Sequence, residues 1–273
     1  FTSGGSSYFT LGYAFTAAED RRNMYNSTAG SNFDQTAAFD RQNPAASRGF
    51  FGSRHNFTLS GNFREEFLSD LATSFGFSFV ARSGRPYSLT FDHFGSVFND
   101  DASGNDNSLI YLPTGIDDPN IAPTSNMAAV QQLVDFARGL DCAKDYLGKS
   151  IPRNTCNNDW YYDLDLRFSQ ELPGLGRLMG SPMGLRDKLT VYAMFDNFLN
   201  LLNDGWNIQR RRNFAGLQDI ASVSGIDAQG PYVIPSAAPL IPGTDGLTDY
   251  QRDNFINVSS SVWRLKVGLS YEF

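Results

Sequence analysis

The last eleven residues of the chain alternate strictly between apolar and polar side chains. The apolar positions are Trp263, Leu265, Val267, Leu269, Tyr271 and Phe273. A period of two predicts a β-strand with one apolar face and one polar face. At an open sheet edge in water such a strand would invite aggregation, whereas in a closed membrane barrel its apolar face meets lipid. The pattern therefore favours a transmembrane β-barrel.

Five earlier segments show the same alternation. They span residues 8–16, 55–64, 71–82, 160–170 and 187–200. Alternating runs bounded by polar residues are typical of strands, and two runs joined by few residues make a hairpin. We interpret residues 83–91 as a continuation of the third strand, with Pro86 near its end, where an absent ladder hydrogen bond matters least. The sequence thus predicts an all-β chain of six strands.

Charged residues fall on only one face of the predicted strand at residues 160–170. In residues 160–170, Asp163, Asp165 and Arg167 alternate with an aromatic and aliphatic row, and Lys266 lies on the polar side of the last strand. Burying such charges in a soluble core would be costly, and exposing the opposite row to water would be equally unfavourable. Lipid outside and an aqueous lumen inside satisfy both faces. We therefore expect these four residues to face the lumen.

The connections between the predicted strands are long, short, long, short and long in turn. The long ones span residues 19–53, 92–159 and 201–258, and the short ones 65–70 and 171–187. Outer-membrane barrels have short periplasmic turns and long extracellular loops, which predicts a periplasmic C-terminus. Since the smallest barrels have eight strands, six strands would form part of a larger antiparallel barrel.

Composition agrees with this interpretation. The chain holds 23 Phe, 12 Tyr and 3 Trp beside 25 Gly, which suits strands with aromatic girdles. Its formal net charge of -7 gives no support to nucleic-acid binding. No run approaches the roughly 18 apolar residues of a membrane helix. The start lacks a Met and a charged leader, so we interpret the sequence as a processed chain or a fragment.

The second long connection carries a predicted helix and the only two cysteines. Apolar residues recur at helical spacing from Met127 to Leu140, after a Thr124-Ser125-Asn126 start. Cys142 and Cys156 lie in the same polar stretch. Outside the cytoplasm such a pair is expected to form a disulfide, worth about 3 kcal/mol in the chain-entropy model, with free thiols as the alternative.

Candidate metal-binding residues are few. Asn99, Asp101 and Ser103 match the start of an EF-hand calcium loop, but its twelfth position is Ile110 instead of Glu, so a solvated turn is the alternative. His55 and His93 lack partners at zinc-ligand spacing. No other residues suggest a metal or a cofactor.

The third long connection contains three consecutive arginines. Arg210, Arg211 and Arg212 could contact an anionic ligand or lipopolysaccharide phosphates, or simply form a basic loop. No Ser-His-Asp or paired-carboxylate arrangement suggests catalysis, so we do not expect an enzyme.

The order of these segments resembles the C-terminal barrel of TonB-dependent outer-membrane receptors, especially the Oar-like group. The resemblance rests on GSRHNFTLSGNF, SGRPYS, NDDASGNDNSLIYLP, WYYDLDLRFSQEL, LTVYAMFDNFLNLLN and WRLKVGLSYEF. It implies strands 17 to 22 of a 22-stranded barrel, in a protein with an N-terminal plug and a TonB box. It also implies that the apolar row ending at Phe273 is the signal read by the barrel assembly machinery.

Two functions remain open at this point. The resemblance implies energised import of a scarce small ligand, such as a siderophore, peptide or glycan, across the outer membrane of a Gram-negative cell. Its partners would be outer-membrane lipid, the assembly machinery and the TonB complex. A passive porin or a surface adhesin is the alternative, since both would use the same long loops.

Overall fold

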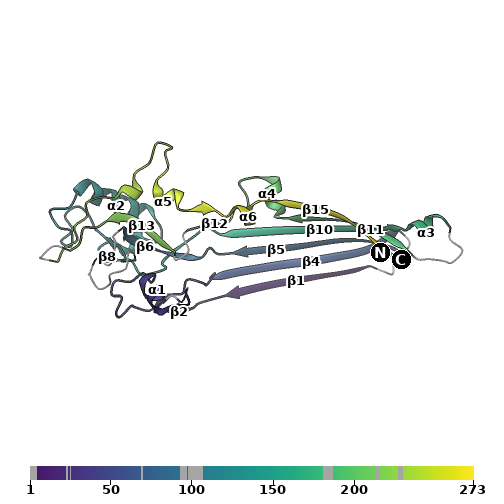
Figure 1. Ribbon diagram of the computed structural model, residues 1–273, viewed down its shortest axis with the longest axis horizontal. Coiled ribbons are helices and arrows are strands. Elements are labelled where there is room, and N and C mark those ends of the chain that lie inside the picture. The colour runs from purple at the N-terminus through teal and green to yellow at the C-terminus, as the bar shows by residue number, and fades with distance from the viewer. Residues whose placement is uncertain are drawn as a thin grey trace.

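The main sheet contains six antiparallel strands. The computed structural model describes residues 5–22, 24, 26–68, 70–92, 97, 107–180, 187–212, 216–226 and 230–273. The strands are β1 (Ser6–Phe15), β4 (His55–Leu68), β5 (Leu71–Arg82), β10 (Tyr161–Pro173), β11 (Lys188–Asp196) and β15 (Arg264–Glu272). They lie in the order β1-β4-β5-β10-β11-β15, each antiparallel to the next (Figure 1). All six predicted strands are confirmed, in an open sheet ending at β1 and β15.

Strand register aligns the apolar residues of neighbouring strands. Leu59 of β4 lies opposite Phe79 of β5, and Phe79 lies opposite Leu164 of β10. On β15, Leu269 pairs with Val191 of β11. Because side chains alternate between the two sides of a sheet, these pairs form one apolar face, and the intervening residues form a polar face. The apolar face is uncovered: Leu269 is 68% exposed.

Residues 83–91 do not continue the third strand, so that prediction was wrong. β6 (Pro86–Asp92) forms a different sheet, parallel to β13 (Leu217–Ser222) and antiparallel to β9 (Cys156–Asn157). Gly84 lies so close to the backbone of Asn158 that a side chain would collide there. Pro86 lacks an N–H for a ladder bond. The first six residues of β6 are buried, as in a core strand.

The second and third long connections fold together into a compact unit at one end of the sheet (Figure 1). We call it the loop lobe: β6 with residues 107–158, 216–226 and 230–252. Its elements include β7 (Tyr111–Leu112), α2 (Met127–Gly139), η1 (Lys144–Tyr146), β8 (Lys149–Ser150), η2 (Ala238–Leu240) and α5 (Asp249–Arg252). Phe91, Ile110, Leu133 and Ile220 are fully buried in its core. The second and third long connections therefore contain a packed core of their own.

The predicted helix of the second connection is confirmed. α2 begins where the Asn126 side chain accepts hydrogen bonds from the N–H groups of Ala128 and Ala129. Such capping satisfies donors that the first helical turn leaves unpaired. The buried stripe of α2, which includes Val130 and Leu133, faces the lobe core.

The first long connection packs against the loop lobe. It contains β2 (Glu19–Asp20), α1 (Ala29–Asp34) and β3 (Ser47–Arg48). The buried Arg153 side chain pairs with Asp20 and donates to Ser47 Oγ over 3.0 Å. Asn154 Nδ2 donates to the carbonyl of Arg48 at 2.6 Å. These contacts join the first long connection to the second, which packs with the third in the core of the lobe.

The remaining elements are short. They are α3 (Leu175–Leu178), α4 (Phe198–Leu202), β12 (Arg210–Arg211), β14 (Phe255–Ile256) and α6 (Val258–Ser261). α3 lies at the end of the sheet opposite the lobe, as does the C-terminus (Figure 1). Among the described residues, no helix combines the length and the apolar character needed to cross a membrane.

Candidate functional site

Aromatic rings cross the apolar face where the strands meet the lobe side. We call this row the aromatic belt: Tyr13, Phe15, His55, Phe57, Trp160 and Tyr162. Ring centroids lie 4.5 Å apart for Tyr13 and Phe57, 6.0 Å for His55 and Trp160, and 6.3 Å for Trp160 and Tyr162. The strand register places these rings at about the same height along the strand direction. Trp206 follows α4, and Trp263 directly precedes β15, both on the lobe side of the sheet (Figure 1).

On the polar face, Asp163 and Asp165 hold the start of the third long connection. Asp165 accepts from the Asn197 N–H at 2.9 Å, and Asp163 accepts from Asn207 Nδ2 at 3.3 Å. Asn197 and Asn207 have φ angles of 54° and 52°, a left-handed conformation that asparagine tolerates better than most residues. Asn207 also donates to the Asn197 side chain. The two carboxylates thus position α4 and the chain that follows it.

The other two residues predicted to face the lumen lie on the same face. Arg167 is opposite Met194, which is opposite Lys266 in the neighbouring strand. Lys266 Nζ lies 3.5 Å from Asp196 Oδ2. The structure therefore groups Asp163, Asp165, Arg167 and Lys266 on one side of the sheet, and their exposure to a lumen stays a prediction.

A further polar network lies at the opposite end of this face. Glu171 accepts from Arg64 at 3.2 Å, from Lys188 at 2.7 Å and from the Ala72 N–H at 3.1 Å. Glu171 of β10 is thereby linked to β4, β5 and β11, next to the two short turns. Sequence reasoning did not single out these residues, because each is an ordinary charged residue until the register brings them together.

The six predicted assembly residues occupy the outer strand of the sheet. Trp263, Leu265, Val267, Leu269, Tyr271 and Phe273 are all exposed. Tyr271 donates a hydrogen bond to Asp187, which also accepts from the N–H groups of Gly176 and Arg177 at 2.7 and 2.8 Å. These bonds, the one from Tyr271 foremost, lower the pKa of Asp187. The last strand is thereby fastened to the turn containing α3.

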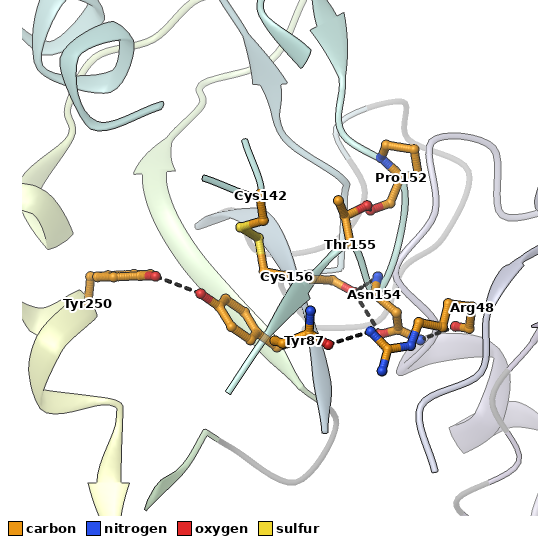
Figure 2. Close-up of a disulfide and its surroundings, with 10 residues drawn as sticks. Arg48, Tyr87, Cys142, Pro152, Asn154, Thr155, Cys156 and Tyr250 are labelled. Carbon is orange, nitrogen blue, oxygen red and sulfur yellow. Dashed lines mark hydrogen bonds between the residues drawn. A yellow bond between two sulfur atoms is a disulfide. The ribbon is translucent and has the colours of Figure 1, made fainter. Parts of the chain in front are cut away.

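The predicted disulfide between Cys142 and Cys156 is confirmed (Figure 2). It joins the segment after α2 to β9, with the two Cα atoms 5.1 Å apart. The surroundings differ from the exposed polar loop that the sequence suggests, since Cys156 is buried in the lobe core. The bond therefore links the helix to the three-stranded sheet of the lobe.

The three arginines lie in different surroundings, and contact of any of them with an anionic ligand stays a prediction. The guanidinium of Arg212 lies 4.5 Å from the ring centre of Tyr87 and 4.1 Å from that of Tyr250, and it is buried. The two tyrosine hydroxyls are hydrogen-bonded to each other at 2.6 Å (Figure 2). Burial raises the pKa of Tyr87. Arg212 is thus a core residue of the lobe, whereas Arg210 and Arg211 are exposed.

A pocket of about 440 Å³ lies beside the aromatic belt. We call it the belt pocket; it is lined by Asp159, Trp160, Tyr162, Leu199, Gly205, Trp206, Asn207, Ile208 and Arg210. No local sequence pattern indicates this pocket, because its walls come from the start of β10 and from the chain around α4 and β12. The wall residues Trp160, Tyr162 and Trp206 are all exposed.

The calcium candidates Asn99, Asp101 and Ser103 lie outside the residues that the structure describes. Within the described ranges, no group of three or more His, Cys, Asp or Glu side chains could hold a metal ion.

Comparisons with protein-family models, with curated proteins and with solved structures find no match for this chain.

Proposed function

We propose that the chain is the barrel portion of a TonB-dependent outer-membrane receptor that imports a scarce small ligand. The observation that carries the proposal is the two-faced sheet. Its apolar side is uncovered across six strands, with Leu11 78% exposed. A contiguous apolar surface of this kind is unfavourable in water and marks a membrane or protein contact. Lipid on that side and water on the polar side satisfy both faces.

The size of the apolar face also suits a bilayer. Along β10 the residues of this face extend from Tyr162 to Leu172 and are apolar except for Gln170, which accepts a hydrogen bond from the Thr73 hydroxyl. At about 3.3 Å per residue and a tilt of about 40°, these ten steps rise about 25 Å, close to the apolar band of outer-membrane barrels. The aromatic belt lies at one border of that band, where tyrosine and tryptophan favour the membrane surface.

In this arrangement the loop lobe is extracellular and the C-terminus periplasmic. The free edges of β1 and β15 pair with further strands of a larger barrel, assembled by the outer-membrane machinery. The folded lobe offers a rigid surface for ligand capture, and the TonB complex supplies the energy, as the sequence resemblance implies. The chain has no proposed catalytic role.

The sidedness of the sheet tests the membrane part of the proposal. Spin labels attached at Leu269→Cys and Lys266→Cys serve as a matched pair, because the two residues lie three positions apart and residues separated by an odd number of positions on a strand point to opposite faces. We expect the label at 269 to collide with oxygen dissolved in lipid, and the label at 266 to collide with a water-soluble nickel chelate. The reverse result would place the register one residue away and reject the topology.

A surface adhesin is the second candidate, because the folded, disulfide-linked lobe would suit binding without transport. The complete gene product separates the two functions. Removal of a TonB box should abolish uptake and leave ligand binding at the cell surface intact if the protein is an importer. Unchanged uptake, or a gene without plug and TonB box, would favour the passive porin or adhesin.

A further inference from the structure

We propose that the belt pocket binds a sugar ring that carries an anionic substituent. The inference goes beyond the proposed function, because it assigns a ligand to a pocket that the import proposal does not use. One wall, Tyr162, lies on the apolar face, and another, Asn207, donates to Asp163 on the polar face. A volume of about 440 Å³ lies within the range of small-ligand sites.

The aromatic walls favour the flat face of a sugar. Trp160 and Tyr162 have nearly parallel rings, with an interplanar angle of 16°. Trp206 adds a second indole, 53% exposed. The face of an aromatic ring carries negative partial charge, so it attracts the weakly positive C–H groups on one side of a pyranose ring. Such rigid rings lose little conformational entropy when a ligand binds.

The polar rim specifies the substituents. Arg210 has five N–H donors, and the contact described for it is a hydrogen bond of 3.2 Å to the carbonyl of Asn254. Its fork geometry suits a carboxylate or a phosphate. Asp159, another residue of the lining, can accept hydrogen bonds from hydroxyl groups. A hydrocarbon ligand would form no hydrogen bond with Arg210 or Asp159, and an inorganic anion would not stack on the aromatic walls. A sugar with an anionic substituent can make both kinds of contact.

The backbone holds Arg210 in place. β12 pairs with β14, which sets Arg210 opposite Ile256 and Arg211 opposite Phe255. Successive residues of a strand point to opposite sides. Arg211 accordingly lies over the ring of Phe255, 6.0 Å from its centre, and is not part of the pocket lining. The two arginines have the same charge and adjacent positions, so Arg211 is the matched control for Arg210.

Tryptophan fluorescence of the 273-residue chain refolded in detergent micelles measures the binding. The probes are glucose 6-phosphate, glucuronate, glucose and inorganic phosphate. We expect both acidic sugars to bind at least about tenfold more tightly than glucose or phosphate, since binding draws on the aromatic walls and Arg210 together. Arg210→Gln should abolish the preference over glucose, Trp206→Ala should weaken all sugars, and Arg211→Gln should change nothing.

A phosphorylated glycolipid in mixed micelles distinguishes the two sources of such a sugar. If the glycolipid binds more tightly than glucose 6-phosphate, and Arg210→Gln removes this binding, the natural ligand is a membrane headgroup. If the glycolipid binds more weakly than glucose 6-phosphate, the natural ligand is a free glycan. Absence of a preference for acidic sugars, or an equal effect of Arg211→Gln, would overturn the proposal. Circular dichroism shows whether Trp206→Ala still folds. If it does not, Arg210→Gln alone tests the proposal, because Arg210 is exposed and its replacement should leave the fold intact.

Discussion

At the scale of single residues, neighbours in sequence have unlike roles. Arg212 is buried between two tyrosine rings, whereas Arg211 is exposed. Asp118 is buried, and its neighbour Asp117 is exposed. Each pair allows the buried member to be tested against an exposed control of the same type.

Replacement of Arg212 by Ala should destabilise the loop lobe by about 2 to 4 kcal/mol, because it removes two ring contacts and a buried hydrogen-bonding group. Arg212→Lys should restore only part of this loss, since an ammonium cannot stack as a planar guanidinium does. Denaturant unfolding followed by near-ultraviolet circular dichroism measures the effect. An equal loss in Arg211→Ala would show that the stacking is not the cause.

Asp118 should make the unfolding free energy of the lobe depend on pH. Burial alone would raise its pKa, but hydrogen bonds from the Thr114 and Asn120 N–H groups and from the Thr114 and Tyr111 hydroxyls outweigh burial and lower it below its ordinary value of 3.8. A carboxyl with a lowered folded-state pKa stabilises the fold above its unfolded pKa, and this contribution is lost as the pH falls through the folded value.

The melting temperature of Asp118→Asn should therefore lie below that of the parent chain at pH 6, and the difference should shrink below about pH 4. Asp117→Asn is the control and should follow the parent at every pH. A difference between Asp118→Asn and the parent that is the same at pH 6 and at pH 2 would refute the linkage.

At the scale of elements, the two faces of β15 should tolerate different substitutions, because one face is apolar and the other polar. Leu269→Arg should destabilise the membrane-inserted sheet by about 2 to 4 kcal/mol near mid-membrane, and Lys266→Leu should cost much less. Unfolding in lipid vesicles, followed by tryptophan fluorescence, compares the two variants. Equal costs would indicate that the apolar face does not meet lipid.

The disulfide links the segment that follows α2 to β9. The double variant Cys142→Ala/Cys156→Ala should lower the unfolding free energy of the lobe by about 3 kcal/mol while leaving the six-stranded sheet intact. Denaturant titration with separate probes on the lobe and the sheet measures both. Loss of both transitions together would mean that the lobe and the sheet fold as one unit.

At the scale of the whole molecule, the open sheet predicts how the isolated chain behaves. Two free edges, at β1 and β15, and the exposed apolar face should make the 273 residues aggregate in water and require detergent. Light scattering with and without detergent tests this. In the complete receptor, deletion of Phe273 should reduce outer-membrane assembly more than ligand binding. A soluble monomer would contradict the barrel proposal.

The sequence by itself determined the six strands, the order of their connections, α2 and the disulfide. Alternation and helical periodicity are local properties, and two cysteines leave one pairing within the chain. The tertiary structure decided the rest, because it depends on distant contacts. Tyr87 meets Tyr250 across 163 positions, and Arg153 meets Asp20 across 133. Those contacts turn apparent loops into a folded lobe, bury Arg212 and form the belt pocket, which no local pattern encodes.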